Sequence, residues 1–284
     1  MTRAAGGLHV TQPTLSKALR ALEDELGKRL FTRHSFSISL TEEGALLRDR
    51  AEDLLLMVDK IEQEFLSLDE VTGGDLYLGL AESYQIRYLA REIKRLKDRY
   101  PDLRYHITSG DTEQVTERLD KGLLDFAVLC GLPNERKYEH LLFPEADYFG
   151  LVMRKDDCLA GREGIRVGDL VGLPLFCSKQ SWEGDIRPWA KERFGELRLE
   201  GSFRLAYNGS VFVKEGLGYL LALDGLVDTS SESGLVFRPL SPALEVPLCL
   251  AWGRRQTLTP IAKRFLDQLR AVFAACGRED HFAP

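Results

Sequence analysis

The sequence predicts an α + α/β protein with a small helical head, one long helix and a larger α/β body. Three observations support this prediction. Apolar side chains recur at helical spacing in 12–26, a second apolar series repeats in sevens in 47–68, and strand-like and helix-like segments alternate from residue 75 onward. With 284 residues, of which 44% are hydrophobic, the chain is long enough for about two domains with buried cores.

The head contains a predicted helix-turn-helix. A short Ala-rich helix, 2–8, is followed by a turn at His9–Val10 and by a longer helix that Thr11 can cap, that tolerates Pro13 in its first turn and that Gly27 ends. One side of the longer helix is polar and basic, and the second helix of such a motif can lie in the major groove of DNA. The opposite side carries the apolar residues Leu15, Leu19, Leu22 and Leu26.

Charge is distributed unevenly along the chain, whose net charge is −6. Residues 1–35 carry six basic and three acidic side chains, a net charge of +3, whereas 36–71 carry three basic and ten acidic side chains, a net charge of −7. The head is therefore the segment in which a phosphate backbone would be favoured. An ordinary solvated surface is the alternative interpretation.

A long helix is predicted to begin at Thr41–Glu43, because Thr41 can cap it and the two acids suit its N-terminal dipole. Its apolar residues are spaced alternately four and three apart, which predicts pairing with another helix, as in a dimer. A helix that lies on its own domain is the alternative. The apolar series is Leu47, Ala51, Leu54, Val58, Ile61, Phe65 and Leu68, and the helix is expected to stop near Thr72–Gly74.

The body is predicted to consist of parallel α/β units, because strand-like and helix-like segments alternate at suitable lengths. The first unit comprises strands at 76–80, 103–108 and 125–129, with helices at 83–100 and from Gly110. The second comprises strands at 149–153 and 175–177, helices at 181–194 and 210–223, an apolar segment at 248–252 and a closing helix at 260–273.

Composition excludes several classes of protein. No segment approaches the roughly 18 to 20 apolar residues that a membrane span needs, and the N-terminus lacks the apolar core of a signal peptide. The five cysteines are scattered and none belongs to a CxxC pair, so neither a zinc site nor a disulfide framework is predicted. We therefore expect a reduced, cytoplasmic protein with no cofactor, no metal and no membrane partner.

Several groups of residues occur together at a recognisable spacing. In the head they are Ala4-Ala5, Leu8 to Ser16, Leu22-Glu23-x-Glu25-Leu26-Gly27, Leu30-Phe31-x-Arg33 and Leu40-Thr41-x-x-Gly44. In the body they are Gly110, Gly122-x-x-Asp125, Glu215-Gly216-x-Gly218, Trp252, Leu258-x-Pro260 and Phe265-Leu266. With these residues the chain resembles the LysR-type transcriptional regulators over essentially its whole length.

The resemblance implies how the chain is divided. Residues 1–41 would form a winged helix-turn-helix DNA-binding domain, 42–73 a linker helix for dimerisation, and 74–284 an effector-binding domain of two lobes that resembles the periplasmic binding proteins. Lobe I would comprise about 75–146 and 252–284, and lobe II about 147–251. The family also has a helix before the segment that Thr2–Ala5 matches. We expect its absence to leave the DNA-binding core incomplete, and a mis-called start is the favoured explanation over truncation or degeneration.

The resemblance also implies DNA-contacting residues. A Gln side chain can bond an adenine edge, a Thr methyl can contact a thymine methyl, and Lys or Arg can reach guanine or phosphate. The segment 31–40 would be the wing, where Arg33 could contact phosphate, although His34-Ser35-Phe36 stands where basic residues are usual. On the helix after the turn the candidates are Gln12, Pro13, Thr14, Ser16, Lys17 and Arg20.

Ligands of such two-lobed folds bind beyond the carboxyl ends of strands, at helix N-termini whose free N–H groups suit carboxylates and other anions. Plain helix capping is the alternative for each candidate. Cys177 lies near the expected cleft, where a buried, inert thiol is favoured over a redox sensor. The candidate effector-binding residues are Ser83, Tyr84, Ser178, Ser181, Asn208, Gly209 and Ser210.

These observations lead to one main hypothesis and one alternative. The main hypothesis is a transcriptional regulator, not an enzyme, that binds promoter or operator DNA as a homodimer or homotetramer and responds to a small, anionic effector. An enzyme is disfavoured because the five histidines do not cluster and the sequence lacks GxSxG, HExxH and P-loop motifs. The alternative is a dimeric ligand-binding protein that has lost DNA binding through N-terminal truncation.

Overall fold

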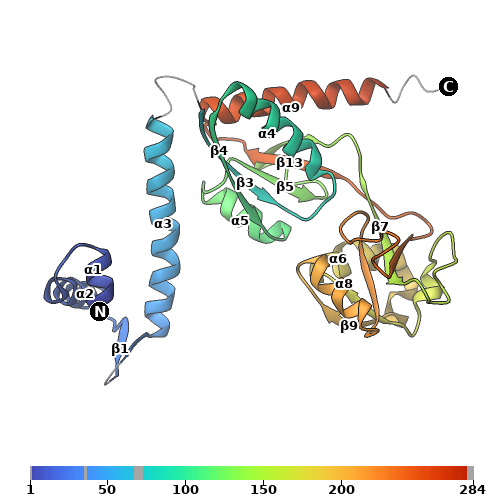
Figure 1. Cartoon of the computed structure of the whole chain (residues 1–284), viewed down its shortest axis with the longest axis horizontal. Helices are drawn as coiled ribbons and strands as arrows, with labels where there is room; N and C mark the ends of the chain where they lie inside the picture. Colours follow the sequence, from blue (N-terminus) through green and yellow to red (C-terminus); the bar gives the residue numbers. More distant parts are fainter. Residues whose placement is uncertain (1, 35–36, 67–72, 280–284) are drawn as a thin grey trace. The chain divides into compact units, whose positions relative to one another are not determined.

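A computed structural model describes residues 2–34, 37–66 and 73–279 (Figure 1). The chain divides into two compact units, Met1–Glu62 and Gln63–Pro284. The first unit contains helices and a small hairpin, and the second contains two β-sheets with their covering helices. In the part of the chain that the structure describes, no helix is long and apolar enough to cross a membrane.

The first unit begins with two helices and a short hairpin. Its helices α1 and α2 and its antiparallel strands β1 and β2 precede the long helix α3. The bounds are α1 Thr2–Gly7, α2 Gln12–Leu26, β1 Phe31–Arg33, β2 Ile38–Leu40 and α3 Glu42–Leu66. The predicted helix-turn-helix, wing and long helix are therefore confirmed. The end of the predicted long helix, including Leu68, lies outside the described residues.

Local capping explains the bounds of α2. Thr11 has extended backbone angles (φ −76°, ψ 150°), and its hydroxyl oxygen accepts a hydrogen bond from the Thr14 N–H at 3.4 Å. Pro13 lies in the first turn, where a backbone N–H would have no partner inside the helix. At the other end Gly27 adopts a left-handed conformation (φ 63°), which glycine reaches without steric cost.

The second unit contains a first sheet whose strands lie in the order β4-β3-β5-β13-β6. Its strands are β3 Gly73–Leu80, β4 Asp102–Ser109, β5 Phe126–Cys130, β6 Tyr138–Leu142 and β13 Leu248–Gly253. The central strand β3 pairs in parallel with β4 and β5, as predicted, whereas β13 pairs antiparallel with β5 and β6.

Helices cover both faces of the first sheet, with α4 (Ile86–Arg99) and α9 (Pro260–Glu279) on one face and α5 (Thr112–Asp120) on the other (Figure 1). The period-2 alternation of β3 explains this arrangement. Leu76 and Leu78 pack with Phe126 and Phe265 beneath α4 and α9, whereas Tyr77 packs with α5.

The second sheet has the strand order β11-β7-β10-β8-β9, with β12 also paired to β7. Its strands are β7 Asp147–Arg154, β8 Pro174–Cys177, β9 Arg198–Ser202, β10 Tyr219–Leu223, β11 Leu235–Pro239 and β12 Glu245–Val246. Parallel pairing joins β10 to β8 and β8 to β9. The helix α8, Ala206–Lys214, leads into β10. We refer to the part built on the first sheet as lobe I and the part built on the second as lobe II.

The helix predicted at 210–223 is wrong in both position and extent. Helix α8 begins at Ala206 and ends at Lys214, and 219–223 forms the buried strand β10 in the middle of the second sheet. A short apolar run does not distinguish a buried strand from a buried helix by periodicity. Gly216, at φ 78°, and Gly218 separate the two elements.

Two other boundaries differ from the expectation. The helix predicted at 181–194 is an irregular helical run, composed of α6 Lys179–Ser181, a π-turn at Trp182–Ile186, α7 Arg187–Ala190 and a 3₁₀ turn at Lys191–Glu196. The chain returns to the first sheet at Leu248, where β13 starts, rather than at 252.

We predict that Gly218→Ala destabilises lobe II by about 2 kcal/mol, because a Cβ at this position would overlap the Pro174 carbonyl oxygen of the neighbouring strand β8. Urea unfolding of the full chain measures the change. Gly184→Ala is the control, since a Cβ there meets nothing within 4 Å. Equal stability of the two variants would contradict the close approach of β10 to β8.

A polar cluster joins β3 to the edge strand β4. The Asp75 side chain, 5% exposed, accepts hydrogen bonds from Arg104 Nη2 at 2.8 Å and from His106 Nε2 at 2.6 Å. Tyr77 stacks on the His106 ring, with 4.6 Å between ring centroids. Burial alone raises the pKa of the Asp75 carboxyl, but the hydrogen bonds and charges of Arg104 and His106 outweigh burial and hold that pKa below its usual 3.8.

We expect this cluster to lose its stabilising effect in acid. A carboxyl whose pKa is lowered by folding contributes stability above its unfolded pKa and loses it as the pH falls through its folded pKa. Wild type should therefore be more stable than Asp75→Asn at neutral pH, and the difference should shrink by about pH 3 in urea unfolding. Asp102→Asn, at an exposed position of β4, should show no such convergence.

Candidate functional sites: the α2 surface and the cleft between the lobes

The outer face of α2 carries exposed polar and cationic side chains. Gln12, Lys17 and Arg20 are exposed, and each of them lacks a hydrogen bond or ion pair to any described residue. Pro13 and Thr14 are also exposed, whereas Ser16 is half-buried. Because Lys17 and Arg20 lie one turn apart, both cations are free to meet an anion on one side of the helix.

The hydroxyl of Thr14 is partly committed to the helix cap, since it lies 2.8 Å from the Thr11 hydroxyl. Its methyl group remains available on an exposed side chain. Arg33 is the last residue of β1. The structure thus groups the α2 candidates on one helix, and Arg33 stands at the end of the first strand of the wing.

Three residues outside the predicted set hold the wing against the helices. The Glu23 carboxylate accepts hydrogen bonds from the backbone N–H groups of Leu30 (2.8 Å) and Phe31 (3.2 Å), which link α2 to β1. Thr41 Oγ1 donates to the Arg29 carbonyl at 2.7 Å and accepts from the Gly44 N–H at 3.0 Å. A side chain at Gly44 would overlap the Leu30 carbonyl oxygen. Glu23, Thr41 and Gly44 therefore position the wing.

The apolar series of α3 is largely uncovered. Leu54 is 67% exposed and Phe65 is 69% exposed, with Val58 and Ile61 also exposed between them. Leu47 and Ala51 are half-buried. A row of large apolar side chains that the chain itself does not bury is typical of an interaction surface.

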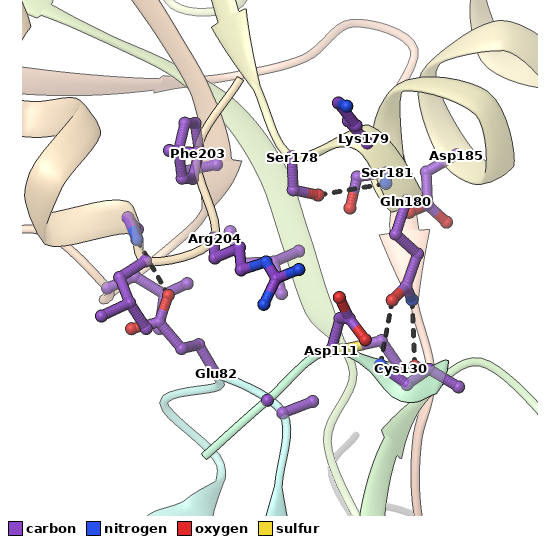
Figure 2. A pocket seen from close by; sticks show the side chains of 18 of the residues that line it. Glu82, Asp111, Cys130, Ser178, Lys179, Gln180, Ser181, Asp185, Phe203 and Arg204 are labelled. Atoms are coloured by element: carbon purple, nitrogen blue, oxygen red, sulfur yellow. Dashed lines mark hydrogen bonds between the residues drawn. The ribbon is translucent and has the colours of Figure 1, made fainter. Parts of the chain in front are cut away.

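A cavity of about 1150 Å³ lies between lobe I and lobe II (Figure 2). Most of its lining residues come from four chain segments: 81–82 after β3, 109–114 at the start of α5, 178–181 after β8, and 202–206 before α8. Apolar side chains of β7 and β10, including Phe149 and Leu221, form part of the lining. The cavity therefore lies where strands end and helices begin, as expected for a ligand site in such a fold.

Two of the predicted effector-binding residues line this cavity. Ser178 and Ser181 are half-buried in its wall, and the Ser178 hydroxyl oxygen caps α6 by accepting from the Ser181 N–H at 3.1 Å. Ser178 therefore has a capping role in addition to its place in the cavity wall.

The remaining predicted residues do not line the cavity. Because α4 begins at Ile86, Ser83 lies in a turn, where its buried hydroxyl accepts from the Gln85 N–H at 2.9 Å. Tyr84 is 52% exposed, with the Arg87 guanidinium 4.5 Å from its ring centroid.

Residues 208–210 also lie outside the cavity lining, again because the helix does not start where it was predicted to start. Since α8 starts at Ala206, these residues lie inside the helix rather than before it. Asn208 is exposed, Gly209 packs closely against Phe203 and Leu220, and Ser210 donates to the Tyr207 carbonyl at 2.7 Å.

The prediction missed the charged residues of the cavity. Figure 2 shows Arg204 directed toward the space between Glu82 and Asp111, and its guanidinium has no hydrogen bond or ion pair to any described residue. Lys179 and Asp185 add a second cation and a further carboxyl. Arg204 was missed because the helix was predicted to start at 210. With the helix start at Ala206, Arg204 lies two residues before the helix, which is the position at which candidate residues were sought.

Burial controls the ionisable groups Asp185 and Cys130 of the cavity wall and Cys177, which precedes the wall residue Ser178. It raises the pKa of the Asp185 carboxyl, against a smaller opposing effect of a Ser181 hydrogen bond. It also raises the pKa of the Cys130 thiol to about 12 and that of the fully buried Cys177 thiol well above its usual range. Both thiols are therefore protonated at neutral pH, which is the unreactive form.

Two family models match the chain. The model described as "Bacterial regulatory helix-turn-helix protein, lysR family" matches residues 1–45, and the model described as "LysR substrate binding domain" matches residues 69–274. The chain belongs to the LysR family. The winged helix-turn-helix and the two-lobed α/β domain predicted from the sequence are thereby confirmed.

Curated relatives and solved structures agree with this assignment. A "Hydrogen peroxide-inducible genes activator" of Pectobacterium carotovorum subsp. carotovorum is 34% identical over 175 residues, which is 61% of this chain but only 57% of the relative. The HTH-type transcriptional regulator YybE of Bacillus subtilis (strain 168) is 25% identical over 96% of this chain and 94% of its own. The fold is similar to that of CbnR, a LysR family transcriptional regulator, with a TM-score of 0.73 at 18% identity over 95% of this chain and 93% of CbnR.

We predict that the cysteines differ sharply in reactivity. Iodoacetamide should label the exposed Cys158 of the native chain near neutral pH and leave Cys130 and Cys177 unmodified until the chain unfolds, because only the thiolate of an accessible cysteine reacts. Peptide mass spectrometry with and without urea measures this difference. Native labelling of Cys177 at the rate of Cys158 would contradict its burial.

Proposed function

We propose that this LysR-family chain is a DNA-binding transcriptional regulator whose activity is set by a small molecule in the cleft between lobe I and lobe II. The observation that carries the proposal is the exposed face of α2. There Gln12, Lys17 and Arg20 have no partner among the described residues, within a segment of net positive charge. A regulator of this kind would act in the cytoplasm.

The chemistry of these side chains suits DNA. The Gln12 amide can bond to the N6 and N7 edge of adenine, and the Thr14 methyl can contact a thymine methyl. Lys17 and Arg20 can reach guanine or neutralise phosphates. Pro13, Ser16 and the wing residue Arg33 complete the proposed contact set.

We infer that α3 pairs with a second copy of the chain. Its uncovered residues Leu54, Val58, Ile61 and Phe65 continue the heptad spacing of Leu47 and Ala51, which is the pattern of a paired helix. A homodimer would present two copies of α2 to two half-sites, and a homotetramer would combine two such pairs.

The proposed effector is a small molecule with an apolar body and an anionic group. Arg204 and Lys179 are cations in the cavity that lack a partner in the described part of the chain, and Ser178 and Ser181 offer hydroxyl groups. A planar guanidinium binds a carboxylate through two parallel hydrogen bonds. The apolar lining from Phe149 and Leu221 would bury the remainder of the ligand.

Oxidation of a thiol is a less favoured means of control, although several relatives are named for hydrogen peroxide-inducible genes. Cys130 borders the cavity and Cys177 is fully buried, and the pKa of each thiol is raised. A redox sensor needs an accessible thiolate. We therefore propose control by ligand binding rather than by oxidation of these residues.

The test is binding of the full chain to the DNA upstream of its own gene. Lys17→Ala and Arg20→Ala should each weaken binding about tenfold in a mobility-shift titration at fixed salt, because each removes a contact to guanine or phosphate. Lys94→Ala is the matched control, since it removes one exposed cation from α4.

The possible results separate the two functions considered. Unchanged affinity of both α2 variants would contradict the assignment of α2 as the reading helix. If the wild-type chain bound no DNA at all but was stabilised by small carboxylates in thermal unfolding, a ligand-binding protein without DNA binding would be favoured.

A further inference from the structure

A carboxylate of lobe I occupies the start of a helix in lobe II. Glu82 follows β3, and its Oε2 accepts a hydrogen bond from the Ala206 N–H at 2.8 Å (Figure 2). Ala206 is the first residue of α8 and is only 1% exposed. The N-cap residue Leu205 makes no side-chain hydrogen bond, so Glu82 performs the capping that the local sequence does not supply.

A second pair of hydrogen bonds crosses the cleft in the opposite direction. The Thr112 N–H, at the start of α5 in lobe I, donates to Gln180 Oε1 of lobe II at 3.0 Å. In return Gln180 Nε2 donates to Thr112 Oγ1 at 2.9 Å. The local cap Asp111 serves a different group, the Gln114 N–H, at 2.9 Å. Each lobe therefore supplies a hydrogen-bond acceptor to the first N–H of a helix in the other lobe.

The bond of Glu82 is the stronger of the two by its chemistry. A carboxylate carries a full negative charge, which the N-terminus of a helix stabilises, whereas the Gln180 amide is neutral. Arg204, two residues before Ala206, also lines the cavity, and its guanidinium makes no ion pair with Glu82 or with any other described residue. The start of α8 is thus a carboxylate-binding position that the chain fills with its own side chain.

We propose that Glu82 is an internal carboxylate that holds lobe I against lobe II, and that a ligand carboxylate displaces it by binding the Ala206 N–H together with Arg204. The proposal rests on the function inferred above for the cleft. The replacement of one carboxylate by another keeps the buried N–H of Ala206 satisfied, so the only hydrogen bond lost is the one that Glu82 makes between the lobes.

The exchange also sets a requirement on the ligand. A side chain of the same molecule competes at an effective concentration in the millimolar range. A free carboxylate that offered only the bond to Ala206 would therefore bind weakly, and the added contact with Arg204 supplies the difference. The lobes joined by Glu82 and the lobes with Glu82 displaced would then differ in affinity for the ligand. Such a difference is the condition for a ligand to shift the equilibrium between the two arrangements.

The experiment measures hydrogen exchange of the Ala206 amide in the full chain, without DNA or effector. Glu82→Ala should speed this exchange about tenfold, since it removes a hydrogen bond to a charged acceptor. Propionate should slow the exchange again in Glu82→Ala, in comparison with sodium chloride at equal ionic strength, and should have little effect on wild type. Glu82→Gln, which keeps an acceptor without the charge, should give an intermediate rate.

Two further variants sharpen the test. Glu113→Ala removes an exposed cavity carboxylate that makes no bond across the cleft, so Ala206 exchange should stay at the wild-type rate. Adding Arg204→Ala to Glu82→Ala should raise the propionate concentration needed for protection. Protection of the Leu78 amide in the core of lobe I reports whether each variant remains folded.

Each result decides a part of the proposal. If the Ala206 amide of folded Glu82→Ala exchanged hydrogen at the wild-type rate, the role of Glu82 as a link between the lobes would be overturned. If hydrogen exchange at Ala206 were fast in Glu82→Ala and propionate did not slow it, the proposed replacement of Glu82 by a free carboxylate would be overturned. Neither result depends on DNA binding, so a failure here is distinguishable from a failure of the regulator function, which the α2 variants test.

Discussion

The first N–H groups of a helix have no partner within that helix, and the way this chain satisfies them organises both of its functional surfaces. In α2 the cap is local: Thr11 accepts from Thr14, which starts the helix at Gln12 and so orients Lys17 and Arg20 outward. In the cleft the caps are partly exchanged between lobes, because Glu82 serves α8 and Gln180 serves α5. The N-terminal donors of α8 and α5 therefore join the lobes at the cavity in which we propose that an anionic ligand binds.

The path of the chain makes this exchange possible. The chain leaves the first sheet after β6, builds the second sheet from β7 to β12, and returns in β13 beside β5. Ala81–Glu82 after β3 and 178–181 after β8 both line the cavity as a result. A ligand bound there would contact both lobes at once, so its binding energy could act on their separation.

The long helix α3 is governed by a different constraint. An amphipathic helix is stable only when its apolar side is buried, and here side chains such as Leu54 and Phe65 remain more than two-thirds exposed in the single chain. Burial of one such side chain is worth about 1.5–3 kcal/mol, so pairing along this seam would supply much of the stability of a dimer.

The sequence alone determined the features that depend on neighbouring residues. The Thr11 cap, the Gly27 stop, the heptad spacing of α3 and the alternation of β3, α4, β4, α5 and β5 follow from local propensity and periodicity, and the structure agrees with them. The cations of α2 were identified for the same reason, since their exposure follows from the helical repeat of a short segment.

Only the tertiary structure decided the cleft. An apolar run such as 219–223 suits either a strand or a helix. It forms a strand here because it pairs between β7 and β8 in the second sheet. In the structure α8 also starts at Ala206, so Asn208 and Ser210 lie inside the helix and Arg204 lies in the cavity wall. Glu82 caps a helix 124 residues further along the chain, and no local pattern encodes a partner at that separation.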